Sequence, residues 1–420
     1  MTVPSAAAQR YRDRNGIKGP WQLAGEVRSG FRGAVVIPSL AEGERLFATL
    51  HCLAANPPAW INRFLVVVVC NHSQEVDNQD RLQNEIDLAR LSDYALGSVL
   101  NLVWIDAVSP GLEVPANRAG VGFARKLGMD LALPCLDWSA DPLLVGLDAD
   151  TLVEDNYLQA IDRHFLWSSK GAAVLPYRHQ PGVDSEQQTA IDRYELFLRS
   201  YVYGLRLAGS PYAFNTVGSA MACRASSYVR CGGMNSRKAG EDFYFLQKLA
   251  KTDGVDLLSW TIVHPEPRIS ELVPFGTGRS MARLLAGDKQ GVLFYPATAF
   301  RILSDWLKLV ECNIAADTEK ILALATEISP VLASYLEQLD WRAVWPGIQK
   351  THRSSARLQQ AFHVWFDGFR TLRLIHLLCE TEFGRGEPEE VLPDYFAWEG
   401  STVPASVAGM LEILRVADMA

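Results

Sequence analysis

The sequence predicts an α/β domain followed by a mostly α-helical region. Between about residues 33 and 176, short apolar runs alternate with longer segments in which apolar residues recur every three or four positions. This alternation is typical of parallel strands joined by crossover helices. After about residue 290, strand-like runs give way to continuous helical periodicity.

The expected strands are short, apolar and rich in β-branched residues, which suits strands that are covered on both faces. They are AVVIP (34–38), FLVVVVC (64–70), VLNLVWID (99–106), LLVGLD (143–148) and AAVLP (172–176). Amphipathic helices are expected between them, over residues 42–54, 75–91, 117–133 and 154–165. The sheet should therefore lie between layers of helices.

The chain is expected to have three parts. These are a polar N-terminal extension over residues 1–30, the α/β domain over 31–290 and a helical C-terminal domain over 291–420. Pro346 and residues 384–388 should interrupt the C-terminal helices. The aromatic residues of that domain are expected to pack against one another: Trp306, Trp341, Trp345, Phe362, Trp365 and Phe366.

Composition excludes several classes of protein. The chain carries 40 Lys and Arg against 48 Asp and Glu, a formal net charge of -8, which disfavours a nucleic-acid partner. The seven cysteines include no CxxC pair, as expected for reduced thiols in a cytoplasm. No stretch reaches the roughly 18 apolar residues of a membrane span, and the N-terminus lacks a signal-peptide core. We therefore expect a cytoplasmic protein without a transmembrane segment.

Two carboxylates, Asp148 and Asp150, close the fourth apolar run. Open α/β sheets bind ligands at the carboxyl ends of their strands, and a spacing of two would point both side chains the same way if the chain stayed extended. Such a pair suits Mg²⁺ or Mn²⁺ with a phosphorylated ligand as the other coordination partner. Alternatively, Asp150 caps the helix expected near Glu154, and Asp148 is an ordinary polar residue at a strand end.

Three segments together resemble the family 2 glycosyltransferases of GT-A fold. The first strand ends in Ile-Pro before a loop with Glu42 and a helix, and the aspartate pair follows about a hundred residues later. The third segment, GSAMACRASSYVRCGGMNSRKAGEDFYFLQKLAK (218–251), combines a small-residue strand, a Gly-Gly turn and a Gly-Glu-Asp that opens a helix. The resemblance covers about residues 33–285. It implies a mixed, mainly parallel sheet and transfer of a sugar, such as a hexose, from a nucleotide-diphosphate sugar to an acceptor hydroxyl.

The resemblance also implies donor-binding residues. Pro38 and Glu42 match the first loop, which meets the nucleotide, and Arg125 matches the Arg of the family's ARN segment. Asn71 follows Cys70 where the family has acidic residues that recognise the base, which argues against uracil. The QxxRW motif of processive synthases is missing, so a single transfer is expected. The helical C-terminal domain could shape the acceptor site or mediate self-association.

Catalytic and metal-binding roles follow on the same basis. Asp148 and Asp150 match the aspartates that hold the ribose and the metal-bound diphosphate, with Asp150 the more direct ligand of Mn²⁺ or Mg²⁺. Asp242, beside Glu241, matches the catalytic base of inverting members. Related retaining enzymes share the aspartate pair, so inversion rests on Asp242.

A histidine and two arginines lie in WTIVHPEPRISELVPFGTGRSM (260–281). The resemblance places His264 where several GT-A enzymes complete the metal shell, and an imidazole nitrogen is acceptable to manganese. Arg268 or Arg279 could clamp diphosphate oxygens in a bidentate manner. Alternatively, His264 closes a strand and the arginines are solvated.

Two other functions compete. The stretch VGLDADTL also resembles the DxDxT of haloacid-dehalogenase-type phosphatases, with Asp148 as nucleophile and Asp150 as acid and base. That family starts its fold with this motif, whereas three strand–helix units precede it here. The second alternative is a GT-A domain that binds a nucleotide sugar without catalysis, although the sequence retains the acids that such a copy tends to lose.

Overall fold

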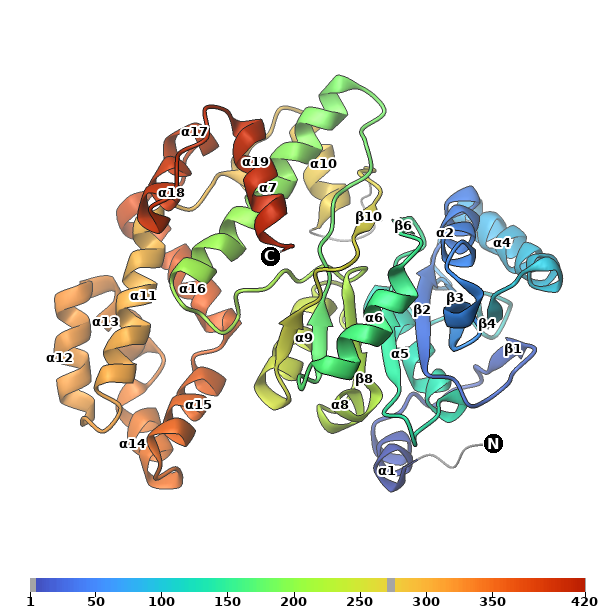
Figure 1. Cartoon of the computed structure of the whole chain (residues 1–420), viewed down its shortest axis with the longest axis horizontal. Coiled ribbons are helices and arrows are strands. Elements are labelled where there is room, and N and C mark those ends of the chain that lie inside the picture. The colour runs from blue at the N-terminus through green and yellow to red at the C-terminus, as the bar shows by residue number, and fades with distance from the viewer. Residues whose placement is uncertain (1–4, 270–275, 420) are drawn as a thin grey trace. The chain divides into compact units, whose positions relative to one another are not determined.

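A computed structural model describes residues 5–269 and 276–419 and contains two compact units (Figure 1). The first, here called the sheet unit, comprises Met1–Gln188, Thr216–Ala282 and Asp418–Ala420. The second, the helical unit, comprises Thr189–Asn215 and Arg283–Ala417. Residues 189–215, which the sequence did not separate from the α/β region, thus group with the helical unit.

The sheet unit is built on a mixed sheet of eight strands in the order β1-β4-β3-β2-β5-β8-β7-β9. Strands β4, β3, β2 and β5 are parallel to one another, whereas β1 runs antiparallel to β4, and β8 runs antiparallel to both β5 and β7. The bounds are Leu23–Gly25 (β1), Gly33–Ser39 (β2), Phe64–Asn71 (β3), Asn101–Ala107 (β4), Leu143–Gly146 (β5), Ala172–Val174 (β7), Met221–Arg224 (β8) and Val255–Leu257 (β9). The predicted mixed, mainly parallel α/β class is confirmed.

The helices of the sheet unit form largely where the amphipathic pattern predicted them. Their bounds are Ala6–Arg14 (α1), Glu44–Ala54 (α2), Pro58–Ile61 (α3), Asn78–Gly97 (α4), Val121–Ala132 (α5), Tyr157–Trp167 (α6), Ala225–Arg230 (α8) and Glu241–Thr252 (α9). Helix α5 can approach the sheet closely at Gly128 because glycine has no Cβ. A Cβ at this position would lie 2.3 Å from Val36 and 2.9 Å from Val69. This close approach brings the side chains of α5 to the middle of the sheet.

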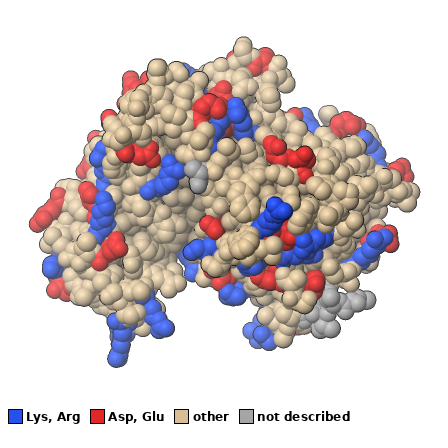
Figure 2. Space-filling model, in the orientation of Figure 1, with Lys and Arg blue, Asp and Glu red and all other residues tan. Residues whose placement is uncertain are grey.

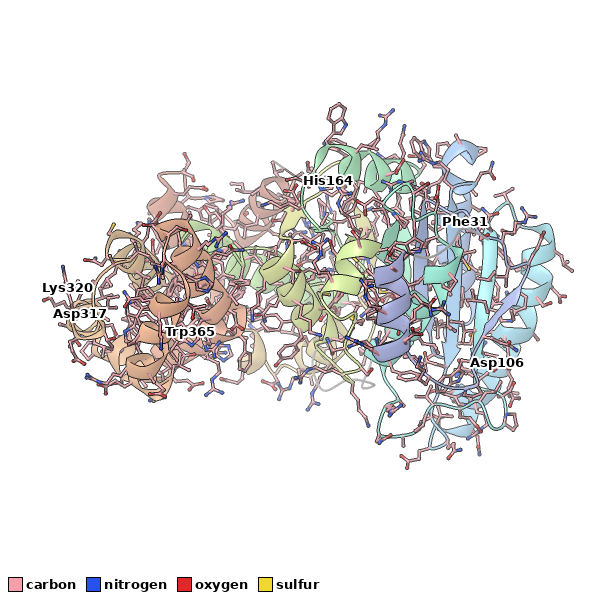
Figure 3. All side chains as sticks on the ribbon, turned by 90° about the horizontal axis from the view of Figure 1, so that it is seen from below. Phe31, Asp106, His164, Asp317, Lys320 and Trp365 are labelled. Carbon is pink, nitrogen blue, oxygen red and sulfur yellow. The ribbon has the colours of Figure 1, made fainter. Side chains whose placement is uncertain are left out.

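Side-chain oxygens cap helices and loop ends in both units. Asp77 accepts hydrogen bonds from the amides of Gln79 and Asp80 at the start of α4. Asp317 likewise accepts one from the Lys320 amide at 2.9 Å, and Asp106 caps the loop after β4 (Figure 3). Such caps satisfy amides that have no partner within a helix.

The sheet unit also contains a second, smaller sheet. A separate two-stranded antiparallel sheet joins Thr151–Val153 (β6) to Val263–Pro265 (β10). Helices Ser185–Leu207 (α7) and Thr277–Leu285 (α10) each run across the boundary between the units. None of the described helices is both long and apolar enough to span a membrane.

The helical unit has a dense aromatic core. Trp306 lies 5.4 Å from Trp341 between ring centroids, Trp341 stacks on Trp345 at 4.9 Å, and all three are fully buried. Its helices after α10 are Ala297–Cys312 (α11), Thr318–Ile328 (α12), Pro330–Gln338 (α13), Trp341–Thr351 (α14), Ser355–Trp365 (α15), Gly368–Leu378 (α16), Pro388–Val391 (α17), Pro393–Glu399 (α18) and Val407–Ala417 (α19). As predicted, the aromatic residues pack against one another.

One predicted helix boundary is wrong. Pro346 lies inside α14 rather than at a break, although proline cannot donate the usual backbone hydrogen bond. The stacked side chains of Trp341 and Trp345 fix the first turns of α14 in the core, and this burial outweighs the lost bond. The expected interruption at residues 384–388 is present, with Gly384 at φ 70°.

The outer surface carries charges of both signs. Figure 2 shows acidic and basic side chains interspersed over the visible face. This distribution agrees with the modest formal charge of -8 over 420 residues.

Candidate active site at the carboxyl edge of the sheet

The loop that follows β2 is held in an unusual backbone conformation. Pro38 is the penultimate residue of β2, and Glu42 lies in the loop with only 8% of its surface exposed. Ala41 and Gly43, on either side of Glu42, have φ angles of 54° and 56°. Positive φ is costly for alanine, so the loop needs external support.

That support comes from two residues that the sequence analysis missed. Asn84 Oδ1 accepts a hydrogen bond from the Ala41 amide, and Asp87 Oδ2 accepts one from the Gly43 amide, both at 2.9 Å. Both side chains are fully buried on α4. They share the buried face of α4 with Leu91, at helical spacing. The sequence does contain a signal that could have identified them, because both are polar residues at core-facing positions of an amphipathic helix.

The end of β3 lies next to this loop support. Asn71 is the last residue of β3 and is 4% exposed. His72, the next residue, is fully buried, and its Nδ1 lies 3.2 Å from Asn84 Nδ2. The ends of β2 and β3, which the family resemblance assigns to the donor nucleotide, are thus joined through Asn84.

The two aspartates lie in a turn and not on a strand. Strand β5 ends at Gly146, and the Thr151 amide donates to the Asp148 carbonyl at 3.2 Å. The extended conformation that would align the two carboxylates therefore does not continue. The alternative of a helix cap is also wrong for Asp150, because α6 begins at Tyr157, after β6.

A buried arginine joins the aspartate turn to the third sequence segment. Arg125, on α5, donates hydrogen bonds to Asp148 and to Glu241 at the start of α9, and its side chain is 3% exposed. Gly218 leaves room for the guanidinium, since a Cβ there would lie 2.2 Å from Arg125 Nη2. The structure thus brings together Arg125, Asp148 and Glu241.

Asp242 lies next in α9 and has a different environment. Its Oδ1 accepts a hydrogen bond from the Phe243 amide at 2.7 Å, and the residue remains partly exposed. Helix α9 begins after Gly240, whose φ of 69° is favourable for glycine. Asp242 therefore places its carboxylate in the first turn of α9, where the helix N-terminus stabilises negative charge.

A second arginine bridges the first loop and the aspartate turn. Arg268 Nε lies 3.1 Å from Asp150 Oδ2, and its Nη2 donates to Glu42 Oε1. Glu266 Oε2 lies 3.9 Å from the same Nε. Arg268, one of the two arginines proposed as diphosphate clamps, therefore contacts the acidic cluster directly.

The other two candidates lie apart from these contacts. His264 Nε2 is 3.0 Å from Glu154 Oε1, and its Nδ1 is 3.0 Å from the Arg178 carbonyl oxygen. Gln180 Nε2 donates to the carbonyls of both His264 and Asp150, so the backbones are linked while the imidazole points to Glu154. Arg279 is exposed on α10, and no ion pair joins it to an acid among the described residues.

The carboxylates outnumber the cations that neutralise them. Burial raises the pKa of Asp150 to about 7, and Asp148 and Glu42 add to this rise while Arg268 opposes it. Burial likewise raises the pKa of Glu241 to about 7 against the attraction of Arg125. The pKa values of Glu42 and Asp242 are raised by the same cause. Four acids of the site thus have raised pKa values, and Arg125 and Arg268 are cations that oppose these shifts.

The donor set fits the chemistry of a hard divalent cation. Glu42, Asp148 and Asp150 supply carboxylate oxygens, and Glu42 Oε2 is buried without a hydrogen-bond partner. Within the described ranges, however, no three acidic, histidine or cysteine side chains are close enough together to hold a metal. The reason is visible in the contacts: Arg268 lies between Glu42 and Asp150, and Arg125 holds Asp148.

Comparisons with known proteins give distant structural matches. No protein-family model and no curated protein sequence matches the chain. S. aureus TarS 1-349 in complex with UDP-GlcNAc is 13% identical, covering 77% of this chain and 93% of its own, with a TM-score of 0.41. Mannosyltransferase PcManGT from Pyrobaculum calidifontis in complex with GDP-Man and Mn²⁺ is 16% identical, covering 98% and 92%, with a TM-score of 0.36.

Proposed function

We propose that the chain is a glycosyltransferase of GT-A type that moves one sugar from a nucleotide-diphosphate donor to an acceptor hydroxyl. The observation that carries this proposal is the pairing of Arg125 with both Asp148 and Glu241. This pairing joins the segment that would bind the donor to the segment that would bind the acceptor. Direct transfer between two substrates requires that both segments face one site.

The donor would lie at the carboxyl ends of β2 and β3. Pro38, Glu42 and Asn71 end or follow these strands, and Arg268 supplies a partly exposed guanidinium for the diphosphate oxygens. Planar guanidinium groups bind phosphate oxygens in a bidentate geometry. Arg279 and His264 lie apart from this cluster and are not needed for the proposed donor contacts.

Mn²⁺ or Mg²⁺ would be held by Asp150, Asp148 and Glu42. When bound, such an ion would offset the negative charge that develops on the departing diphosphate, an effect of several kcal/mol in comparable enzymes. The raised pKa of Asp150, about 7, means that protons would compete with the ion below neutral pH. The proposed activity should therefore fall in acid.

Asp242 is the better base of the two neighbouring acids. The Glu241 carboxylate accepts a hydrogen bond from Arg125, and this contact occupies an oxygen that a base needs to accept the proton of a hydroxyl. Asp242 as a residue is partly exposed, whereas burial of its carboxyl group raises the pKa. The raised pKa makes the carboxylate a stronger base for the proton of an attacking hydroxyl. General base catalysis of this kind contributes about 10²- to 10⁴-fold in rate. Attack assisted by this base would invert the anomeric carbon.

A panel of nucleotide-diphosphate sugars tests the function. The purified protein is incubated with each sugar and MnCl₂, and released nucleoside diphosphate is measured, because slow transfer to water reveals the donor without a known acceptor. We expect release from one class of donor, its loss with EDTA, and its loss in Asp150→Asn. The Arg279→Gln variant is the matched control and should keep the activity.

Two outcomes would contradict the proposal. Release of inorganic phosphate from p-nitrophenyl phosphate would favour the phosphatase alternative, with Asp148 as nucleophile. Protection against thermal unfolding by a nucleoside diphosphate, without turnover of any nucleotide sugar, would favour a non-catalytic binding protein.

A further inference from the structure

Arg268 has a position that a simple diphosphate clamp does not require. Its guanidinium lies between Glu42 and Asp150, two carboxylates from segments more than a hundred residues apart along the chain, and it approaches Glu266 as well. The Arg268 side chain is 25% exposed, whereas those of Glu42 and Asp150 are 8% and 18% exposed. The arginine thus reaches from the surface into the acidic cluster.

The cluster needs a cation at this point. The Glu42 and Asp150 side chains are both largely buried, and Glu42 Oε2 has no hydrogen-bond partner. Arg125 cannot supply the missing charge, because its hydrogen bonds go to Asp148 and Glu241. Arg45 pairs with Glu266 at 2.6 Å, and its side chain is exposed. Arg268 is therefore the cation that contacts both Glu42 and Asp150.

We propose that Arg268 competes with the divalent cation for Glu42 and Asp150, and that the ion binds only as this arginine leaves them. A guanidinium stays protonated at all accessible pH values, so the two charges cannot share the pair without strong repulsion. The displaced arginine can then bind the donor diphosphate, and this last step rests on the proposed function. The cation and the diphosphate would therefore favour each other's binding. The cation takes the two carboxylates from Arg268, and the diphosphate binds the guanidinium that is set free.

The competition is tested with Mn²⁺ alone, without donor or turnover. Free Mn²⁺ is followed by its electron paramagnetic resonance signal while wild-type protein, Arg268→Gln and Arg268→Lys are titrated. Loss of one neighbouring charge changes the affinity of a carboxylate for a cation by about 10- to 1000-fold, by analogy with proton binding. We expect Arg268→Gln to bind Mn²⁺ at least about tenfold more tightly than wild type. Arg268→Lys, which keeps the charge but cannot bridge both acids, should show a smaller gain.

Two controls assign the effect to this contact. Arg45→Gln removes a nearby positive charge that does not contact Glu42 or Asp150, and it should change Mn²⁺ affinity less than Arg268→Gln does. The double variant Arg268→Gln with Asp150→Asn should lose the gain, because the carboxylate released by the arginine is gone. Thermal unfolding of each variant checks that it is folded.

Equal or weaker Mn²⁺ binding by Arg268→Gln overturns the competition, as does a gain of the same size in Arg45→Gln. Absence of Mn²⁺ binding in all variants overturns it too. These results are separable from the proposed function. Tighter Mn²⁺ binding by Arg268→Gln without turnover of any nucleotide sugar would support the competition and reject the transferase. Mn²⁺-dependent turnover of a nucleotide sugar without tighter Mn²⁺ binding by Arg268→Gln would support the transferase and reject the competition.

Discussion

Thr49 holds the turn between the two aspartates: its Oγ1 donates a hydrogen bond of 2.9 Å to the carbonyl oxygen of Ala149. Thr49 is fully buried on α2, and Ala149 is 2% exposed. Helix α2 directly follows the loop that carries Glu42, so this bond connects that loop to Asp148 and Asp150. The geometry of the acidic cluster thus depends on a threonine that carries no charge.

Replacing Thr49 by valine should destabilise the fold. The side chains have similar volumes, but valine leaves the buried Ala149 carbonyl without its donor, which costs about 1–3 kcal/mol. Urea unfolding measures this loss, and Thr49→Ser, which keeps the hydroxyl, should recover part of it. Equal stability of the valine and serine variants would show that the hydrogen bond does not matter.

Gly218→Ala should displace the Arg125 guanidinium. The new Cβ would lie 2.2 Å from Nη2, so the arginine must move away from Asp148 or the backbone must shift. We expect a loss of about 1–3 kcal/mol in the free energy of unfolding, as for overpacked cores. Gly347→Ala is the matched control: it lies inside α14 with no atom within 4 Å of its Cβ, and alanine should stabilise that helix by roughly 0.5–1 kcal/mol. Destabilisation of both variants to the same degree would contradict this account.

Stability should fall between acid and neutral pH because of Asp150. Its pKa rises from 3.8 in the unfolded chain to about 7 in the folded protein, so the folded state binds more protons in this window. The resulting contribution is fully present below the lower value and is lost as the pH passes the higher one. Asp150→Asn removes the titration, so it should gain stability relative to wild type as the pH rises from about 4 to about 8. Urea unfolding at several pH values checks this, and a difference that stays constant with pH would refute it.

Asp242→Asn should lower the rate of sugar transfer by about 10²- to 10⁴-fold, with little change in donor affinity. An amide cannot accept the hydroxyl proton, but it can still accept the hydrogen bond from the Phe243 amide. Glu241→Gln is the comparison, because an amide oxygen can still accept from Arg125, and its effect on the rate should be smaller. Steady-state kinetics with the donor found in the screen separates kcat from KM. Near-normal kcat in Asp242→Asn would remove the base assignment and leave the fold untouched.

Removing Asn84 should loosen the Glu42 loop. Ala41 and Gly43 keep positive φ angles through hydrogen bonds to buried side chains of α4, and Asn84→Leu leaves the Ala41 amide without its partner. We expect a loss of about 1–3 kcal/mol in stability and a raised KM for the donor. Asn84→Asp keeps an acceptor for the Ala41 amide, so its stability and its KM for the donor should stay closer to those of wild type. Unchanged donor KM in Asn84→Leu would separate the loop support from donor binding.

Much of the fold could be read from local pattern, whereas much of the site could not. The five predicted strands and four intervening helices formed because side-chain periodicity is a property of neighbouring residues. Strand β8 was identified only as a small-residue strand, and its antiparallel place between β5 and β7 depends on sheet order. Pro346 shows the opposite failure, since packing of Trp341 and Trp345 overrode a local helix-breaking signal.

The sequence by itself determined the α/β class and singled out the aspartate pair, because both are expressed within a few consecutive residues. Only the tertiary structure decided which charges meet. Arg125 and Glu241 are 116 residues apart, and Arg268 and Glu42 are 226 apart, so no local propensity encodes their contact. The order of the strands and the close approach of α5 to the sheet bring these groups together, and burial then makes each of their charges depend on the others.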